Sequence, residues 1–199
     1  MQTRLPTEER QAEIVEAALR LASASSPALI TTGDIADAIG VTQGAVFKHF
    51  PTKDAIWLAA MRSVRESLLH ALQAAVDEAD TPGDALHAMF EAHVDFVIAH
   101  PGVPRLIFHE LQQPADSAAK LEVRAVLQGY RKLLLAVLNQ TVAQRQASAD
   151  VDPEAAATAF IGLIQGLVMQ SMLTGRPAAM RQQAGRVFAL YLRGIGAAS

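Results

Sequence analysis

Polar and basic side chains gather in residues 42–53, a stretch that contains no acidic residue. Thr42 and Gln43 carry groups that form hydrogen bonds, and Lys48 and Lys53 carry positive charge. Glutamine side chains can pair with the edges of DNA bases, and lysines neutralise backbone phosphates. These residue types at this spacing predict a surface that binds a nucleic acid duplex.

Groups that would support catalysis are missing from the sequence. It has no nucleophile elbow, P-loop, glycine-rich dinucleotide turn or HExxH motif. It has no cysteine, which excludes disulfides, thiol catalysis and cysteine-ligated zinc. Ser171 and Ser199 have no base beside them in the sequence. We therefore expect a binding protein that is not an enzyme and has no cofactor.

Metal binding by histidine is a second chemistry to consider. His87 and Glu91 are four residues apart, a spacing that can place two ligands on one face of a helix. His93, His100 and His109 follow further along the chain. They do not form the tight cluster of three ligands that a zinc site requires, so we expect no metal site.

Two short helices near the N-terminus would position the polar and basic side chains. Thr31 and Asp34 occupy the two positions of a capping box at the start of the first helix. Gly40 can end that helix in a left-handed conformation. Thr42 can then cap a second helix over Gln43–Phe50. This layout is a helix-turn-helix, whose second helix enters the DNA major groove.

Residues 31–58 resemble the DNA-binding segment of TetR-type one-component regulators. The residues that carry the resemblance are Thr31-Thr32, Asp34-Ile35-Ala36, Gly40-Val41-Thr42, Gly44, Phe47, His49-Phe50 and Lys53. The family often has tyrosine where this chain has Phe47, so the contact of a phenol with phosphate is lost while ring packing is kept. The resemblance implies a homodimeric transcriptional regulator, usually a repressor that a small ligand releases from DNA.

The expected DNA-binding residues follow from this pattern. They are Thr32, Thr42, Gln43, Gly44, Phe47, Lys48, His49 and Lys53. Thr42, Gln43 and Lys48 would contact bases or adjacent phosphates, because residues at the start of a recognition helix reach base edges. The small Gly44 would allow close approach to the groove, and Thr32, His49 and Lys53 would hold phosphates. Arg4 would enter a neighbouring minor groove if residues 1–6 form an arm.

The whole chain reads as an all-α protein of about nine helices, because it shows no sustained alternation of apolar and polar residues. Helices are expected near residues 7–25 (capped by Thr7), between 31 and 40, and at 43–50, 53–79, 84–99, 104–112, 117–146, from 152 onward, and 179–195. We predict two domains. Residues 1–52 form a three-helix DNA-binding domain, and residues 53–199 form a larger helical domain for ligand binding and dimerisation.

The total charge does not by itself favour DNA binding. The formal net charge is −3, and residues 1–54 hold five Lys/Arg and seven Asp/Glu. Four of these acids lie at the start of the first helix, where they can face solvent and favour its positive end. The local charge at the docking surface decides affinity, so we expect a moderate dependence on salt.

Residues 155–175 form an uncharged run that is long enough to cross a bilayer. Gln165, Gln170 and Ser171 interrupt its apolar character, so we favour a helix buried on two sides, by its own core and by a partner subunit. The expected interface of a homodimer through the last two helices consists of Phe160, Leu163, Leu167, Val187, Phe188 and Tyr191. A monomer in which these helices are simply central is the alternative.

A ligand pocket would be mostly apolar with a few placed polar groups. The candidates are Trp57, Met61, Phe90, His93, Val97, His100, Phe108, Tyr130, Gln165 and Met169. Taken singly, apolar residues at helical spacing are usually core residues. Taken as a set, they favour an apolar or aromatic ligand.

The sequence therefore predicts a sequence-specific transcriptional regulator, a repressor that a small apolar or aromatic ligand releases from a palindromic operator. Its partners would be double-stranded DNA, the small molecule and a second copy of the chain. The polar N-terminus lacks the apolar core of a signal peptide, so we expect a cytoplasmic protein without a membrane span. The alternative is a DNA-binding protein of the same fold without a small-molecule ligand, controlled by a protein partner or acting structurally.

Overall fold

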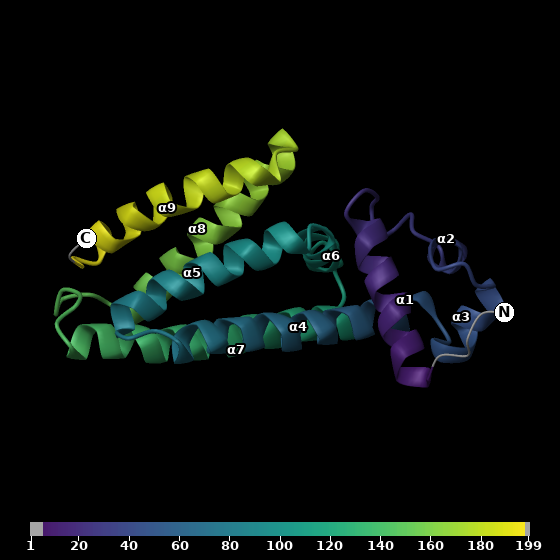
Figure 1. Cartoon of the computed structure of the whole chain (residues 1–199), viewed down its shortest axis with the longest axis horizontal. Helices are drawn as coiled ribbons and strands as arrows, with labels where there is room; N and C mark the ends of the chain where they lie inside the picture. The colour runs from purple at the N-terminus through teal and green to yellow at the C-terminus, as the bar shows by residue number, and fades with distance from the viewer. Residues whose placement is uncertain (1–5, 198–199) are drawn as a thin grey trace. The chain divides into compact units, whose positions relative to one another are not determined.

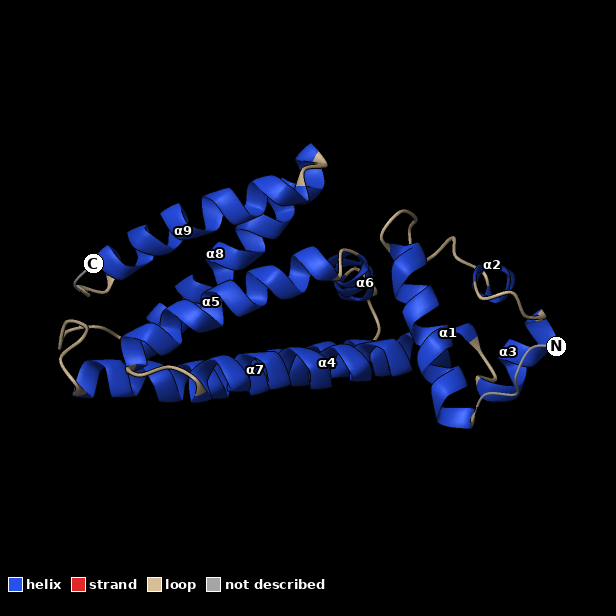
Figure 2. Ribbon diagram, viewed as in Figure 1, coloured by secondary structure: helices blue, strands red, loops and turns tan. Residues whose placement is uncertain are grey.

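The computed structural model describes residues 6–197, and every regular element in that range is an α-helix (Figure 2). In chain order, the helices of Figure 1 are α1 (Thr7–Ala22), α2 (Thr32–Ala38), α3 (Gln43–His49), α4 (Lys53–Asp77), α5 (Pro82–Ala99), α6 (Gly102–Leu111), α7 (Ala118–Ala143), α8 (Pro153–Thr174) and α9 (Pro177–Gly194). The predicted all-α class with about nine helices is confirmed. Arg4, expected in a minor-groove arm, lies outside the described residues.

The helices gather into two compact units. The first extends to Glu66 and also includes His100–Ala125, and the second consists of Ser67–Ala99 and the chain from Val126 onward. Helices α4 and α7 therefore contribute residues to both units, and α6 belongs to the first. These units are defined by how compactly their residues pack and do not test the predicted functional domains. The assignment of DNA binding to residues 1–52 and of ligand binding and dimerisation to residues 53–199 stays a prediction.

In the first unit, α2 and α3 pack against α1. The apolar residues of α1 recur at helical spacing, which puts Ile14, Ala17 and Ala18 on one buried face. Ile35 of α2 and Val46 of α3 are fully buried as well. Each short helix thus contributes its apolar side to a common core and leaves its polar side to solvent.

Helix α6 also packs against α1 in this unit, and a glycine makes the approach possible. A Cβ atom on Gly102 would lie 2.0 Å from the carbonyl oxygen of Leu19, inside van der Waals contact. Nearby, Glu122 of α7 pairs with Arg62 and Arg65 of α4, at nitrogen–oxygen distances of 3.2 Å each. The first halves of α4 and α7 are therefore held together by an ion-pair network.

In the second unit, α5, α8 and α9 pack around an aromatic core, with α8 and α9 side by side (Figure 1). The ring of Phe160 lies edge-on to those of Phe90 and Tyr191, with centroids 5.3 and 5.4 Å apart. Phe188 packs against Phe90 at 5.0 Å. These geometries are among the favourable ones for aromatic pairs.

Several helix ends follow the sequence signals and others differ. Gly40 has φ of 67° and Asp152 caps α8, both as predicted. By contrast, Thr7 is the first helical residue of α1 rather than its cap, and Pro6 precedes it without a side-chain cap bond. Helix α5 begins at Pro82, two residues early, because Thr81 accepts a hydrogen bond from the backbone N–H of Asp84 and acts as the cap.

Candidate nucleic-acid interface

We call α1, α2 and α3 the reader. Its α2 begins with a complete capping box, in which Oγ1 of Thr31 accepts from the N–H of Asp34 at 3.1 Å and the Asp34 carboxylate accepts from the N–H of Thr31 at 2.8 Å. These hydrogen bonds, the backbone bond first, lower the pKa of Asp34 below its usual value. After α2, the left-handed Gly40 reverses the chain and the N–H of Val41 bonds to the carbonyl of Ala36 at 3.0 Å.

Helix α3 presents one polar face to solvent. Thr42 caps it by accepting from the N–H of Ala45 at 3.2 Å. Val46 is fully buried, whereas Phe47 is 44% exposed. The other exposed residues of the cap and helix are Thr42, Gln43, Gly44 and Lys48. The structure thus brings five of the eight predicted DNA-binding residues together on one accessible surface.

Thr32 has a different position from the one that its predicted phosphate contact requires. Its side chain is buried, with 8% of the residue exposed, and its Oγ1 accepts a hydrogen bond from Nε2 of Gln43 at 2.6 Å. The first residue of α2 is therefore tied to the first residue of α3. This bond could not be predicted from the sequence, because the two residues are eleven positions apart and no known motif pairs a threonine with a glutamine at that spacing.

Lys53 is held within the protein. Its Nζ donates to the backbone carbonyls of Ile30, Ala28 and Pro27 at 3.0, 3.1 and 3.4 Å. An ammonium group has three hydrogens, so all of its donors are used by the loop that leads into α2. The structure gives Lys53 a role in fixing that loop, and its predicted phosphate contact stays a prediction.

His49 stands at the end of α3 and is half-buried. Its carbonyl accepts a hydrogen bond from Gln11 of α1 at 3.4 Å, which ties the end of α3 to α1. Within residues 6–197, its buried Nδ1 has no hydrogen-bond partner. The predicted phosphate contact of this ring stays a prediction.

The predicted ligand-binding residues are divided between the two units. Trp57, Met61, His100 and Phe108 belong to the first unit, and the others belong to the second. Trp57 and Met61 are buried core residues. Gln165 and Met169 are exposed on α8, so they do not line an interior pocket of the protomer. The shared pocket of these residues stays a prediction.

A polar pair lies inside the second unit, where three of the predicted ligand-binding residues come together. Nδ1 of His93 is 3.1 Å from the hydroxyl of Tyr130, and the ring of Phe90 lies in the same aromatic cluster through Phe160. Burial lowers the pKa of His93 to about 4 and raises the pKa of Tyr130. The imidazole is therefore neutral at physiological pH.

Among the described residues, no three potential metal-ligating side chains lie together.

The predicted dimer residues divide into two classes. Phe160, Leu167, Phe188 and Tyr191 are buried within the protomer, so they have no surface to offer a partner and their assignment is corrected. Leu163 and Val187 are partly exposed. The pattern of the sequence showed that α8 and α9 were apolar on two sides, but it could not show which side faced the protomer's own core.

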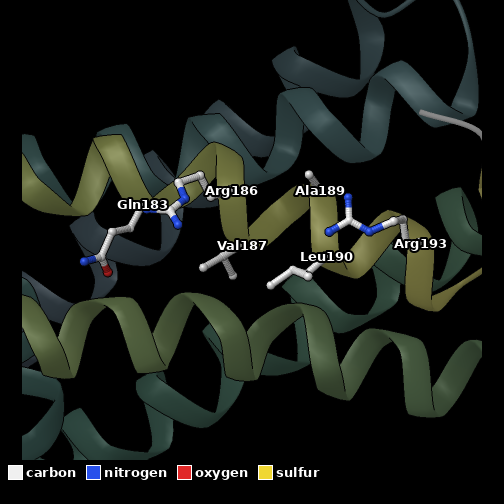
Figure 3. Close-up of a pocket in the computed structure, with 6 residues that line it drawn as sticks. All are labelled: Gln183, Arg186, Val187, Ala189, Leu190 and Arg193. Atoms are coloured by element: carbon white, nitrogen blue, oxygen red, sulfur yellow. The ribbon is translucent and has the colours of Figure 1, made fainter.

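The accessible surface of α8 and α9 contains apolar and small residues beside polar ones such as Gln165 and Arg186. Met169, Leu173 and Leu190 are 43, 79 and 61% exposed, and a Cβ on Gly162 or Gly166 would meet nothing within 4 Å. Helix α9 also lines a groove of about 510 Å³, which is formed by Val187, Ala189 and Leu190 together with Gln183, Arg186 and Arg193 (Figure 3). Helix α8 is long and apolar enough to cross a membrane, a test that a core helix also passes.

The reader has the features of a helix-turn-helix DNA-binding protein. Two threonine-capped helices are joined by a turn with a left-handed glycine, and the second presents an exposed polar face without an acidic residue. These features define the class of protein, a helix-turn-helix DNA-binding protein.

Comparison with known proteins identifies the family. Residues 14–60 match the model of bacterial regulatory proteins of the tetR family, and residues 112–186 match a tetracyclin repressor-like C-terminal domain. The chain belongs to the TetR family of DNA-binding transcriptional regulators.

Individual relatives resemble the chain over most of its length. The HTH-type transcriptional regulator TtgR of Pseudomonas putida is 28% identical over 177 residues, which cover 86% of this chain and 84% of TtgR. The nucleoid occlusion factor SlmA of Haemophilus ducreyi is 25% identical over 79% of this chain and 78% of its own. The crystal structure of FadR from Bacillus subtilis with stearoyl-CoA shares the fold, with a TM-score of 0.80, 17% identity and coverage of 92% of this chain and 98% of that one.

Proposed function

We propose that this regulator is a cytoplasmic repressor that binds an inverted-repeat operator as a homodimer and is released by a small apolar or aromatic molecule. The observation that carries the DNA-binding part is the exposed face of α3, where Gln43 and Lys48 stand beside the small Gly44. A small reader gains affinity when a second copy binds an adjacent half-site, because the second contact is then intramolecular.

The proposed dimer uses the accessible face of α8 and α9. Its support is the exposed apolar side chains Met169, Leu173 and Leu190 next to glycines that allow two helices to approach closely. Exposed apolar patches of this kind mark interfaces between proteins. A two-fold axis through this face would set two readers at a fixed separation, which an inverted repeat must match.

The proposed ligand is apolar or aromatic. Its support is the composition of the helical body, together with FadR of Bacillus subtilis, whose structure contains stearoyl-CoA. A ligand would lower DNA affinity only by the difference between its affinities for the DNA-binding state and the released state. Helix α4 follows α3 directly and is the proposed carrier of this signal.

Selection of random duplex DNA on the purified protein, followed by sequencing, tests the proposal. We expect enrichment of an inverted repeat whose half-site spacing reports the separation of the two readers. No enrichment at low salt, with a folded dimer verified by sedimentation, would refute the repressor function. A thermal-shift screen with apolar compounds then separates a ligand-responsive regulator from the alternative without a small-molecule ligand, because consistent silence would favour the alternative.

A further inference from the structure

The hydrogen bond between α2 and α3 fixes the orientation of a side chain that faces solvent. Nε2 of Gln43 donates to Oγ1 of Thr32 at 2.6 Å. Gln43 is exposed at the start of α3, whereas Thr32 is buried and cannot itself reach far beyond the protein surface. Thr32 therefore acts on the outside only through the amide that it holds.

The remaining hydrogen-bonding capacity of the amide is defined by that bond. A glutamine amide has two N–H donors and one oxygen acceptor. Thr32 takes one N–H, which leaves one N–H and the Oε1 acceptor of Gln43 for a partner outside the protein. A partner that satisfies both must present an acceptor beside a donor.

Among the purines in the major groove, adenine presents that pair. Its N7 accepts and its N6 amino group donates, whereas guanine presents two acceptors, N7 and O6. An Oε1 held toward guanine O6 would leave two acceptors facing each other and cost affinity. The geometry points to Gln43 as a reader of adenine in each half-site and to Thr32 as the positioning residue that selects adenine over guanine.

This inference rests on the proposed DNA-binding function and adds the base that one side chain reads. Its test starts from the inverted repeat recovered by selection. Four versions of that duplex, with A·T, T·A, G·C or C·G at each symmetric position in turn, are compared by competition binding with wild-type protein and with Gln43→Ala. We expect one position per half-site at which wild type prefers adenine by about fivefold to a hundredfold and Gln43→Ala shows no preference.

Thr32 is tested by two substitutions that differ in one group. Thr32→Val keeps the shape of the side chain but removes the acceptor, and Thr32→Ser keeps the hydroxyl. We expect Thr32→Val to reduce the adenine preference about threefold to tenfold at that position only, and Thr32→Ser to retain it. In the Gln43→Ala background, Thr32→Val should have no further effect on base preference.

The outcomes separate the inference from the proposed function. An enriched repeat at which Gln43→Ala changes no position, or changes a guanine preference, would overturn the inference and leave the regulator intact. A Thr32→Val variant that binds all four duplexes equally more weakly would show a merely structural role, and would overturn the assignment of Thr32. If no duplex is enriched by the wild type, the proposed function and the inference fail together.

Discussion

Polar side chains of the reader are occupied within the protein before any DNA is bound. Lys53 donates to three backbone carbonyls and Gln43 donates to Thr32, so a charge or an amide near the recognition helix is not automatically free. The sequence identified the polar and basic residue types in this segment. It could not distinguish a lysine that contacts phosphate from one that fixes a loop 23 to 26 residues away, because that difference depends on tertiary contacts.

Lys53→Ala tests the structural role of this residue. Because three hydrogen bonds to a charged group are lost at a half-buried site, we expect the free energy of unfolding to fall by about 1–3 kcal/mol. Chemical denaturation measures this change. Since its donors are already used, the dependence of DNA affinity on salt should keep the wild-type slope.

Lys48→Ala is the matched control, because Lys48 is an exposed lysine of α3. Its loss should leave stability unchanged and reduce the salt slope by about one unit for DNA of any sequence. The opposite assignment would hold if Lys53→Ala reduced the slope and Lys48→Ala did not.

His93 makes stability depend on pH. Burial lowers the pKa of His93 to about 4, below the usual value of 6.5, so the folded protein resists a proton that the unfolded chain accepts. The contribution of neutral His93 to the free energy of unfolding should therefore be fully present above pH 6.5. It should be lost as the pH falls from 6.5 toward 4, which lowers the free energy of unfolding by about 2 kcal/mol.

Denaturation of wild type and of His93→Gln across this range measures the contribution. The variant should show a smaller loss between pH 6.5 and 4. His70→Gln is the control, since His70 is exposed, and its profile should follow the wild type. Parallel profiles for wild type and His93→Gln would contradict the assignment.

At the scale of the elements, local signals predicted the existence and order of the helices better than their ends. Threonine and aspartate caps were recognisable because their bonds are local in sequence, as at Thr31 and Asp152. The packing of α6 against α1 was not recognisable, because it depends on Gly102 meeting a backbone carbonyl more than eighty residues earlier. For the same reason the sequence did not place α6 in the unit that contains the reader.

Gly102→Ala should disrupt this packing. A methyl group at 2.0 Å from the Leu19 carbonyl forces α6 away from α1, and backbone cannot move as cheaply as a side chain. We expect a loss of about 1–3 kcal/mol in the free energy of unfolding. Denaturation of the variant measures it.

Gly33→Ala provides the comparison within the same unit. A Cβ on Gly33 would make an ordinary contact at 3.4 Å with the Thr31 hydroxyl, in a helix where alanine is favoured over glycine. This variant should be as stable as wild type or slightly more stable. Equal effects of the two substitutions would show that the approach of α6 to α1 is not tight.

At the scale of the molecule, the question is whether the accessible face of α8 and α9 is covered by a second copy of the chain, as in a dimer, or is open to solvent, as in a monomer. The sequence predicted that both helices were apolar on two sides, and the structure shows which side the protomer itself covers. The buried side contains the large aromatic residues, and the accessible side contains glycines, exposed leucines and arginines such as Arg186 and Arg193. The spacing of apolar residues does not distinguish the two faces of these helices. The packing of α5 against one face shows which of them belongs to the core of the protomer.

Leu190→Ala tests the dimer proposal. Truncation of an exposed leucine should not affect the folded protomer, but at an interface it should weaken dimerisation about tenfold. Leu127→Ala is the control, because Leu127 is also an exposed leucine (47%) but lies on α7. Sedimentation velocity over a range of concentrations should show dissociation for Leu190→Ala alone. Identical behaviour of both variants would place the interface elsewhere.

The shortness of α2 and α3 has a consequence for how mutations would distribute in this protein. Each has seven residues, well below the length at which an isolated helix is stable in water, so both depend on α1 for their shape. A genetic screen for loss of repression should therefore recover substitutions at buried positions such as Ile14 and Ala18 as readily as at Gln43. Heritable changes of operator preference would come from the few exposed positions of α3, whereas heat-sensitive alleles would come from α1.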